Sequence, residues 1–262
     1  MKTFSKILCV AALSLANSAL AAPIWMTGND GATLFTVDSV SAAATTVGNF
    51  GQSSTYTLSF DGAGDLYGIS NGFSNGTLVK INQLTGQATT VGASSGIANL
   101  MAMAFKADGT LYVASWSTNS LYTMNQLTGA ATLVGQLGFS GIMDIDFDSQ
   151  GNLYGLSDSL YKINLGTGQG TLVTSLANTC LMGMAIDSSD RFLATDYCTA
   201  NTPLYQIDTS TGQLTSLGLT GIASSMGGAM LLPANDVPEP ATIALFSLGL
   251  LGLGALRRKR QA

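Results

Sequence analysis

Short segments in which hydrophobic and polar residues alternate recur five times along the chain. The five copies are LFTVDSVSAAATTVG from Leu34, LVKINQLTGQATTVG from Leu78, LYTMNQLTGAATLVG from Leu121, LYKINLGTGQGTLVT from Leu160 and LYQIDTSTGQLTSLG from Leu204. Their starts lie 44, 43, 39 and 44 residues apart. Alternation over a few residues is typical of a strand with one buried face. Each copy therefore predicts two strands joined by a polar turn.

A second repeat lies between these copies and predicts two further strands. It reads LSFDGAGDLYGIS (58–70), MAFKADGTLYVAS (103–115), IDFDSQGNLYGLS (145–157) and MAIDSSDRFLATD (184–196). The polar middle of each copy supplies a turn, because Asp bonds its own backbone and Gly tolerates positive φ. One full unit is thus four antiparallel strands, named a to d in chain order. In residues 101–135 they are MAMAF, LYVAS, LYTMN and ATLVG.

A period near forty residues, built from four short strands, is typical of a propeller blade. The chain ends determine the expected number of blades. Residues 24–27 fit strand b, and residues 226–230 fit strand a, so together they complete one blade. We therefore predict an all-β, five-bladed β-propeller over residues 22–233, closed by pairing of the N- and C-terminal strands. Closure removes exposed sheet edges. The alternative, an open or six-bladed array, has no spare repeat to support it.

The amino-terminal residues 1–21 have the pattern of a secretory signal peptide. Lys2 and Lys6 precede an apolar run over residues 7–15, and Ala19-Leu20-Ala21 matches a cleavage site. We expect a signal helix that is removed after Ala21. A retained membrane anchor is the alternative, but the apolar run is short for one.

The carboxy-terminal residues have three parts. A linker over residues 234–240 contains Val237-Pro238-Glu239-Pro240, residues 241–256 carry no charge, and residues 257–262 begin with Arg257-Arg258-Lys259-Arg260. Sixteen helical residues span about 24 Å, so we predict a transmembrane helix over residues 241–256 with a basic cytoplasmic tail.

This three-part pattern resembles the PEP-CTERM sorting signal of Gram-negative bacteria. The resemblance implies export and recognition by an exosortase-type membrane protease. It also implies an inner-membrane-anchored precursor, removal of the tail, and delivery to the cell surface or the extracellular matrix. By the same resemblance, Pro238, Glu239 and Pro240 are the recognition motif. The body resembles propeller repeats of uncharacterised bacterial surface proteins, a likeness that assigns no activity.

Charge and composition exclude several classes of function. Residues 22–236 hold four basic and fourteen acidic side chains, a net charge of −10, which argues against nucleic acid or an anionic membrane as a partner of the body. The chain has no histidine and no G-x-S-x-G motif. Nucleophilic catalysis therefore has no support, and we assign no catalytic residue.

Two cysteines remain after removal of the signal peptide. If Ile186 faces Phe192 across strands a and b, Cys180 and Cys198 lie directly opposite each other, within reach of a bridge. An exported chain meets an oxidising compartment, so we predict a disulfide. Two free thiols are the alternative.

One copy of strand a carries two carboxylates where the other copies have small or neutral residues. Asp144 and Asp146 would share one face near the channel, and oxygen ligands of this kind can hold a hard cation such as calcium. No D-x-D-x-D-G loop or closing glutamate follows. A solvated pair at the channel mouth is therefore the alternative, and no other cofactor is expected.

The d-to-a and b-to-c connections vary in length and content, and they share one face of the predicted propeller. We name this the loop face; it would carry Trp116, Phe73 and Tyr197. Aromatic side chains on a rigid scaffold can stack on sugars. The alternative is that they cap blade cores.

We expect a non-enzymatic binding or structural component of the extracellular polysaccharide matrix, contacting polysaccharide or a surface protein. The alternative function is a hydrolase or lyase using Asp144 and Asp146, with or without calcium.

Overall fold

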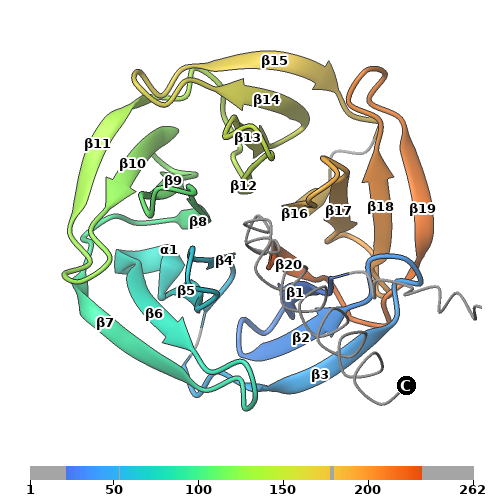
Figure 1. The fold of residues 1–262 in the computed structure, drawn as a ribbon, viewed down its shortest axis with the longest axis horizontal. Coiled ribbons are helices and arrows are strands. Elements are labelled where there is room, and N and C mark those ends of the chain that lie inside the picture. Colours follow the sequence, from blue (N-terminus) through green and yellow to red (C-terminus); the bar gives the residue numbers. More distant parts are fainter. Residues whose placement is uncertain (1–21, 53, 178–179, 232–262) are drawn as a thin grey trace, which may run out of the picture.

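The computed structural model describes residues 22–52, 54–177 and 180–231, and these form a ring of five four-stranded sheets (Figure 1). Each sheet is one blade, and its four strands run antiparallel from the central channel to the outside. The predicted signal helix, the linker over residues 234–240, the transmembrane helix and the basic tail lie outside the described residues. Within the described part of the chain, no helix is long and apolar enough to cross a membrane.

The strands follow the repeat along the chain. Blade 1 comprises β20 (Met226–Met230), β1 (Ile24–Thr27), β2 (Thr33–Val37) and β3 (Ala44–Asn49). Blade 2 comprises β4 (Leu58–Phe60), β5 (Leu66–Ser70), β6 (Thr77–Ile81) and β7 (Ala88–Ser94). Blade 3 comprises β8 (Leu100–Phe105), β9 (Leu111–Ser115), β10 (Ser120–Met124) and β11 (Ala131–Gln136). Blade 4 comprises β12 (Asp144–Phe147), β13 (Leu153–Leu156), β14 (Ser159–Ile163) and β15 (Gly170–Ser175). Blade 5 comprises β16 (Leu181–Ile186), β17 (Phe192–Asp196), β18 (Pro203–Ile207) and β19 (Leu214–Leu219).

The two chain ends close the ring, as the sequence predicts. Strand β1 pairs antiparallel with β20, so that Ile24 lies opposite Met230 and Trp25 lies opposite Ala229. The hydroxyl of Thr27 also donates a hydrogen bond to the carbonyl oxygen of Met226, at 3.0 Å. Blade 1 therefore takes its innermost strand from one end of the chain and its other three strands from the opposite end.

Asx turns shape both kinds of repeated turn. Between strands a and b of blade 4, Oδ1 of Asp148 accepts hydrogen bonds from the amides of Gln150 and Asn152, at 3.0 and 2.8 Å. Between strands c and d, Oδ1 of Asn82 accepts in the same way from Leu84 and Thr85. Equivalent acceptors recur in the other c-to-d turns, at Asp38, Asn125, Asn164 and Asp208. The sequence pattern thus encodes each turn locally.

The hydrophobic core consists of five clusters, each between two neighbouring blades. At four of the interfaces an aromatic residue of strand b meets one of the next blade. The ring centroids lie 4.8 to 5.9 Å apart in the pairs Trp25–Phe60, Tyr67–Phe105, Tyr112–Phe147 and Tyr154–Phe192. Burial of these rings between blades holds the sheets face to face.

Blade 5 keeps this contact by exchanging two side chains. In blades 2 to 4 a phenylalanine at the end of strand a faces a leucine in strand b, as in the pair Phe105–Leu111. In blade 5 the order is reversed, because Ile186 faces Phe192. The ring of Phe192 still reaches Tyr154 of blade 4. Blade 5 thus has its aromatic side chain in strand b and its aliphatic side chain in strand a, the reverse of blades 2 to 4, and fills the same space between blades.

Glycines let the outside of each blade pack against the next one. A Cβ atom on Gly135 of β11 would lie only 2.0 Å from the carbonyl oxygen of Thr167, in the c-to-d turn of blade 4. Gly48 of β3 meets Thr85 of blade 2 in the same way. These contacts bring the backbone of one outer strand against the Thr-Gly turn of its neighbour. They leave no room for a side chain.

Candidate functional site

Asp144 and Asp146 lie on β12, the innermost strand of blade 4, and both bind the backbone of blade 5. Oδ2 of Asp144 accepts a hydrogen bond from the amide of Met184 at 2.8 Å, and Oδ1 accepts from Ile145 at 3.0 Å. Oδ2 of Asp146 accepts from Ile186 at 2.7 Å, and Oδ1 accepts from Phe147 at 2.8 Å. Every carboxylate oxygen of the pair thus accepts a backbone amide. The pair fastens two neighbouring innermost strands together.

Burial changes the acidity of both groups. Removal from water raises the pKa of Asp146 to about 7, against the opposing effect of its two backbone amide donors. Desolvation also raises the pKa of Asp144 well above its ordinary value, and the nearby charge of Asp146 adds to that effect. Asp144 is fully buried, so it is not the solvated carboxylate that the alternative interpretation assumed.

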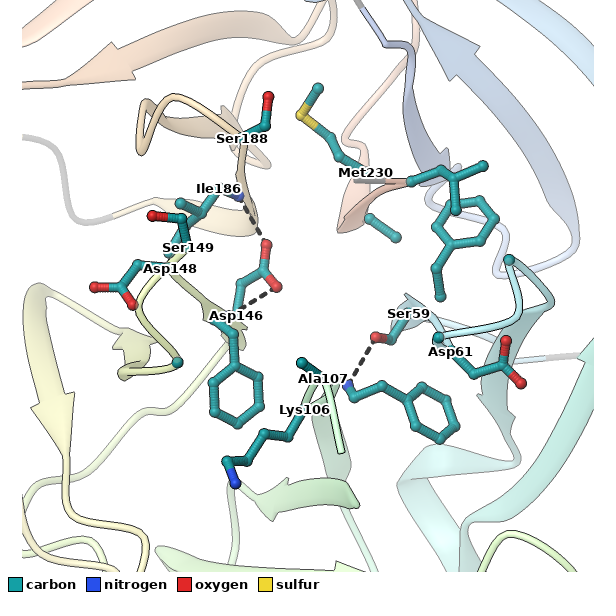
Figure 2. A pocket seen from close by; sticks show the side chains of 18 of the residues that line it. Ser59, Asp61, Lys106, Ala107, Asp146, Asp148, Ser149, Ile186, Ser188 and Met230 are labelled. Atoms are coloured by element: carbon teal, nitrogen blue, oxygen red, sulfur yellow. Dashed lines mark hydrogen bonds between the residues drawn. The ribbon is translucent and has the colours of Figure 1, made fainter. Parts of the chain in front are cut away.

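A pocket of about 520 Å³ occupies the end of the channel where the a-to-b turns meet (Figure 2). We name this end the turn face. The carboxylate of Asp146 and the hydroxyl of Ser59 lie in the pocket, and Met230 and Leu231 form part of its wall. Ser59 accepts a hydrogen bond from the amide of Phe105 at 3.0 Å, and a hydroxyl that accepts in this way can also donate its proton to an acceptor. The pocket therefore combines apolar walls with a carboxylate and a hydroxyl.

The loop face, which the sequence pattern favours as the binding surface, lies at the opposite end of the propeller, and the repeat pattern does not predict this pocket. The turns that form it repeat closely, a pattern that indicates structure rather than binding. The unusual pair Asp144 and Asp146 within strand a was the available signal. This pair indicates which strand lines the channel, but it does not predict a cavity on the turn face.

The calcium assignment to Asp144 and Asp146 stays a prediction. The neighbouring Asp148 accepts two backbone amides through Oδ1 and the side-chain amide of Asn152, at 2.7 Å, through Oδ2. A cation here would have to share carboxylate oxygens that already accept hydrogen bonds from N–H groups. The three aspartates therefore fit an Asx turn and a strand-to-strand link better than a dedicated calcium site.

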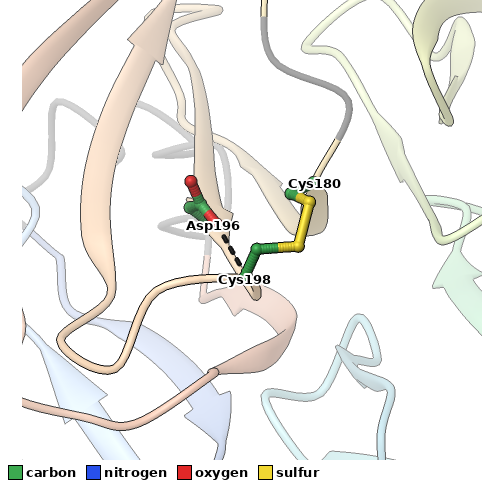
Figure 3. Close-up of a disulfide and its surroundings, with 3 residues drawn as sticks. All are labelled: Cys180, Asp196 and Cys198. Carbon is green, nitrogen blue, oxygen red and sulfur yellow. Dashed lines mark hydrogen bonds between the residues drawn. A yellow bond between two sulfur atoms is a disulfide. The ribbon is translucent and has the colours of Figure 1, made fainter.

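The predicted disulfide joins Cys180 to Cys198, with the Cα atoms 5.7 Å apart (Figure 3). The expected pairing register was wrong by one residue beyond Gly183. Gly183 faces Thr195, but Leu181 faces Asp196, because a β-bulge interrupts the ladder between them. Consequently the amide of Tyr197 binds the carbonyl of Cys180, and Cys198 lies one position further along. The bridge forms from this offset position.

Asp196 lies beside the disulfide and accepts a hydrogen bond from the amide of Cys198, at 2.7 Å. The two sulfur atoms and this carboxylate lie within 4.8 Å of one another, a spacing that also suits metal ligands. Both sulfurs are already joined to each other, whereas a metal site needs thiolates. The disulfide and Asp196 therefore form a structural cross-link at the loop-face ends of strands a and b of blade 5.

The structure places Phe73, Trp116 and Tyr197 in the b-to-c connections of blades 2, 3 and 5, on the loop face. Trp116 and Phe73 are 48% and 49% exposed, and Phe73 packs against Tyr56 with ring centroids 4.9 Å apart. The hydroxyl of Tyr197 donates to Oδ1 of Asn29 at 2.8 Å. Within residues 22–52, 54–177 and 180–231, no hydrogen bond or ring contact joins any two of these three side chains.

Two aromatic residues of the d-to-a connections, on the same loop face, do cap the core. Phe50 is fully buried between blades 1 and 2, and Phe139 stacks on Tyr161 with ring centroids 3.8 Å apart. These two rings therefore pack on the blades, whereas Trp116 and Phe73 leave about half of their surface exposed. The sorting residues Pro238, Glu239 and Pro240 lie outside the described residues.

The fold is similar to that of several solved structures. A chain solved in work on the de novo evolutionary emergence of a symmetrical protein is 18% identical, with a TM-score of 0.55 over 81% of this chain and 99% of that one. A chain of a nidogen/laminin complex is 12% identical, with a TM-score of 0.58 and coverage of 79% and 97%. A protein of unknown function from Bacteroides thetaiotaomicron is 18% identical, with a TM-score of 0.54 and coverage of 79% and 60%. At these identities the likeness shows the fold alone.

Two family descriptions match the sequence, whereas no curated protein matches it. The PEP-CTERM protein-sorting motif matches residues 236–260 and confirms the resemblance drawn from the sequence. That motif indicates export, a membrane-anchored precursor processed by an exosortase, and sorting to the cell surface. A repeat of unknown function, DUF6923, matches residues 25–186, more than half of the chain. The chain therefore belongs to the DUF6923 repeat family.

Proposed function

We propose that the mature protein is a non-enzymatic binding component of the extracellular polysaccharide matrix, exported and sorted to the cell surface as a closed propeller. The exposed Trp116 ring on the loop face carries this proposal. The backbone at Trp116 is tied to the preceding d-to-a connection, because the amide of Trp116 donates to the carbonyl of Asn99 at 2.8 Å. A large aromatic ring left 48% exposed on a rigid loop is suited to stacking on a sugar ring.

The ring closure supports a role in which rigidity matters. All five blades pack on both neighbours, and the disulfide fastens the loop-face end of β16 and β17. A ligand therefore meets a preformed surface, which lowers the entropy that binding costs. The acidic body makes neutral glycan a better partner than an anionic polymer.

The test is a glycan-binding screen with the protein secreted as the mature form. Trp116→Ala should abolish retention on the glycan that binds the wild type, and Phe73→Ala should weaken it. About half of each side chain is exposed, so both variants should stay folded, although Phe73→Ala also loses the ring contact with Tyr56 and should lower the unfolding temperature slightly. Unchanged retention in Trp116→Ala would exclude the loop face as the binding surface.

A matched variant distinguishes the loop face from the pocket on the turn face. A Cβ added at Gly62 meets no atom within 4 Å, so Gly62→Trp can extend a ring over the pocket without disturbing the backbone. This variant should retain glycan if the loop face binds it. If Gly62→Trp loses retention and Trp116→Ala keeps it, the glycan binds in the pocket and not on the loop face.

The second candidate function is a hydrolase or lyase that uses the channel carboxylates. Its supporting observation is that Asp146 lines the pocket with a pKa of about 7, which suits proton transfer near neutral pH. Asp144 is buried behind it, so the pair does not offer two reacting carboxylates to one substrate. Turnover of a polysaccharide that disappears in Asp146→Asn, with the fold intact, would favour this function over binding.

A further inference from the structure

The described chain leaves the propeller beside the pocket. Strand β20 runs along the channel and ends at Met230, and Leu231, the last described residue, lines the pocket together with Gly64 of the blade 2 turn. Every other innermost strand ends on this same face, where it enters its a-to-b turn. The link to the sorting signal therefore begins on the turn face, at the pocket itself.

The distance from this exit to the membrane is limited by the length of the chain. Nine residues, 232–240, separate Leu231 from the uncharged segment over residues 241–256. A fully extended residue spans at most about 3.6 Å, so nine residues reach about 32 Å. A tether this short, attached near the propeller axis, keeps the face that it leaves nearest to the bilayer.

We propose that, in the membrane-anchored precursor, the turn face and its pocket point toward the membrane, and that removal of the tail frees the pocket for large partners. This inference rests on the sorting part of the proposed function. The loop face, with Trp116 and Phe73, points away from the membrane throughout. A polymer or protein partner thus reaches the loop face of the precursor, but reaches the pocket only of the processed protein.

The charge on the turn face indicates that this face is held near the bilayer rather than inserted in it. The a-to-b turns carry six aspartates, and three of them form ion pairs, Asp65 with Lys80, Asp108 with Lys106 and Asp187 with Arg191. The other three, Asp61, Asp148 and Asp190, have no basic partner of this kind among the described residues, so these groups together carry a net charge of −3 (three cations against six carboxylates). Carboxylates of this kind are repelled by anionic headgroups and are costly to desolvate. The tether, not an attraction for lipid, therefore sets the orientation, so a longer tether should abolish the protection.

Cysteine labelling tests the orientation without knowledge of any ligand. Gly62→Cys places a thiol at the pocket on the turn face, where a Cβ has open space. Ser74→Cys, on the exposed helix α1 (Gly72–Asn75) of the loop face, is the matched control. Each full-length variant is expressed with and without the processing protease, and the surface-exposed protein is treated with a maleimide attached to a large polymer. Cys180 and Cys198 do not react, because they form the disulfide, and Cys9 is removed with the predicted signal peptide.

We expect Gly62→Cys to react several-fold more slowly in the unprocessed precursor than in the processed protein, and Ser74→Cys to react equally in both. Inserting about thirty Gly/Ser residues after Pro233 adds a tether of roughly 30 Å and should restore labelling of the precursor. Equal labelling of Gly62→Cys in both forms, with the precursor sedimenting with membranes, would overturn the orientation but leave the sorting intact. A precursor that does not sediment with membranes would instead overturn the sorting proposal, and this inference with it.

Discussion

The carboxylate of Asp146 lies 2.7 Å from the backbone nitrogen of Ile186 and accepts its hydrogen bond across the gap between blades 4 and 5. Blades 2 and 3 are joined in the same place by a neutral group, because the hydroxyl of Ser59 accepts from the amide of Phe105 at 3.0 Å. The same backbone link is therefore made by a serine in one interface and by an acid in another. Only the acid makes the link sensitive to pH.

The pH dependence of stability should reveal this group. An aspartate in an unfolded chain has a pKa near 3.9, whereas burial raises the pKa of Asp146 to about 7. Between these two pH values the carboxyl of Asp146 is protonated in the folded protein but ionised in the unfolded chain. Its contribution to the free energy of unfolding is therefore complete below about pH 4 and is lost as the pH rises through 7. Asp146 contributes at most about 4 kcal/mol to this fall.

We expect the free energy of unfolding of Asp146→Asn to fall less between pH 5 and pH 8 than that of the wild type. Denaturant titrations at several pH values measure both slopes. Asp108→Asn is the control, because the exposed Asp108 has a pKa of about 2, lowered by its link to Lys106, and stays ionised throughout this range. An unchanged slope in Asp146→Asn would show that its carboxyl does not titrate there.

Gly135→Ala should destabilise the propeller through a single backbone contact. The added methyl group would lie 2.0 Å from the carbonyl oxygen of Thr167, so blades 3 and 4 would have to separate on their outer side. Overpacking of this kind costs about 1–3 kcal/mol. Thermal or denaturant unfolding checks this loss. Gly62→Ala, where the new methyl meets no atom within 4 Å, should stay within about 0.5 kcal/mol of the wild type.

Removal of the disulfide should destabilise the folded protein without changing its architecture. The bridge spans 18 residues between Cys180 and Cys198, and closing a loop of that size contributes about 3 kcal/mol. The double variant Cys180→Ser/Cys198→Ser should unfold at a lower denaturant concentration than the oxidised wild type. It should also match the reduced wild type and show no response to reductant. A wild type that is equally stable with and without reductant would contradict this contribution.

The exchanged pair in blade 5 should behave as a coupled unit. Phe192→Leu removes the ring that meets Tyr154 at 4.8 Å and should cost about 1–3 kcal/mol. Adding Ile186→Phe restores the arrangement of blades 2 to 4, with phenylalanine in strand a and leucine in strand b. The double variant should therefore recover much of the loss, as measured by a double-mutant cycle. Strictly additive losses would show that the two positions pack independently.

The fold was predictable because its information is local and repeated. Each Asx turn needs only a short segment such as Asn82 to Gly86, and each strand needs only alternating hydrophobic and polar residues. Because the same pattern occurs in five repeats, each repeat predicts the same four-stranded blade. The complementary ends, with Trp25 in a b-type strand and Ala229 in an a-type strand, gave the blade count. The same repeat register predicted the disulfide. It did not predict the β-bulge between Leu181 and Gly183. A bulge inserts one residue without a strong sequence signal.

The amino-acid sequence by itself determined the repeat, the number of blades, the ring closure, the cysteine pair and the sorting motif. Each of these depends on residues near one another along the chain or on matching positions of a repeat. Only the tertiary structure decided that Asp144 and Asp146 bind the backbone of blade 5, that a pocket opens on the turn face, and that Leu231 leaves beside it. These features arise where strands from several blades converge on one axis. Their spacing depends on how the blades pack, which no single segment of the sequence encodes.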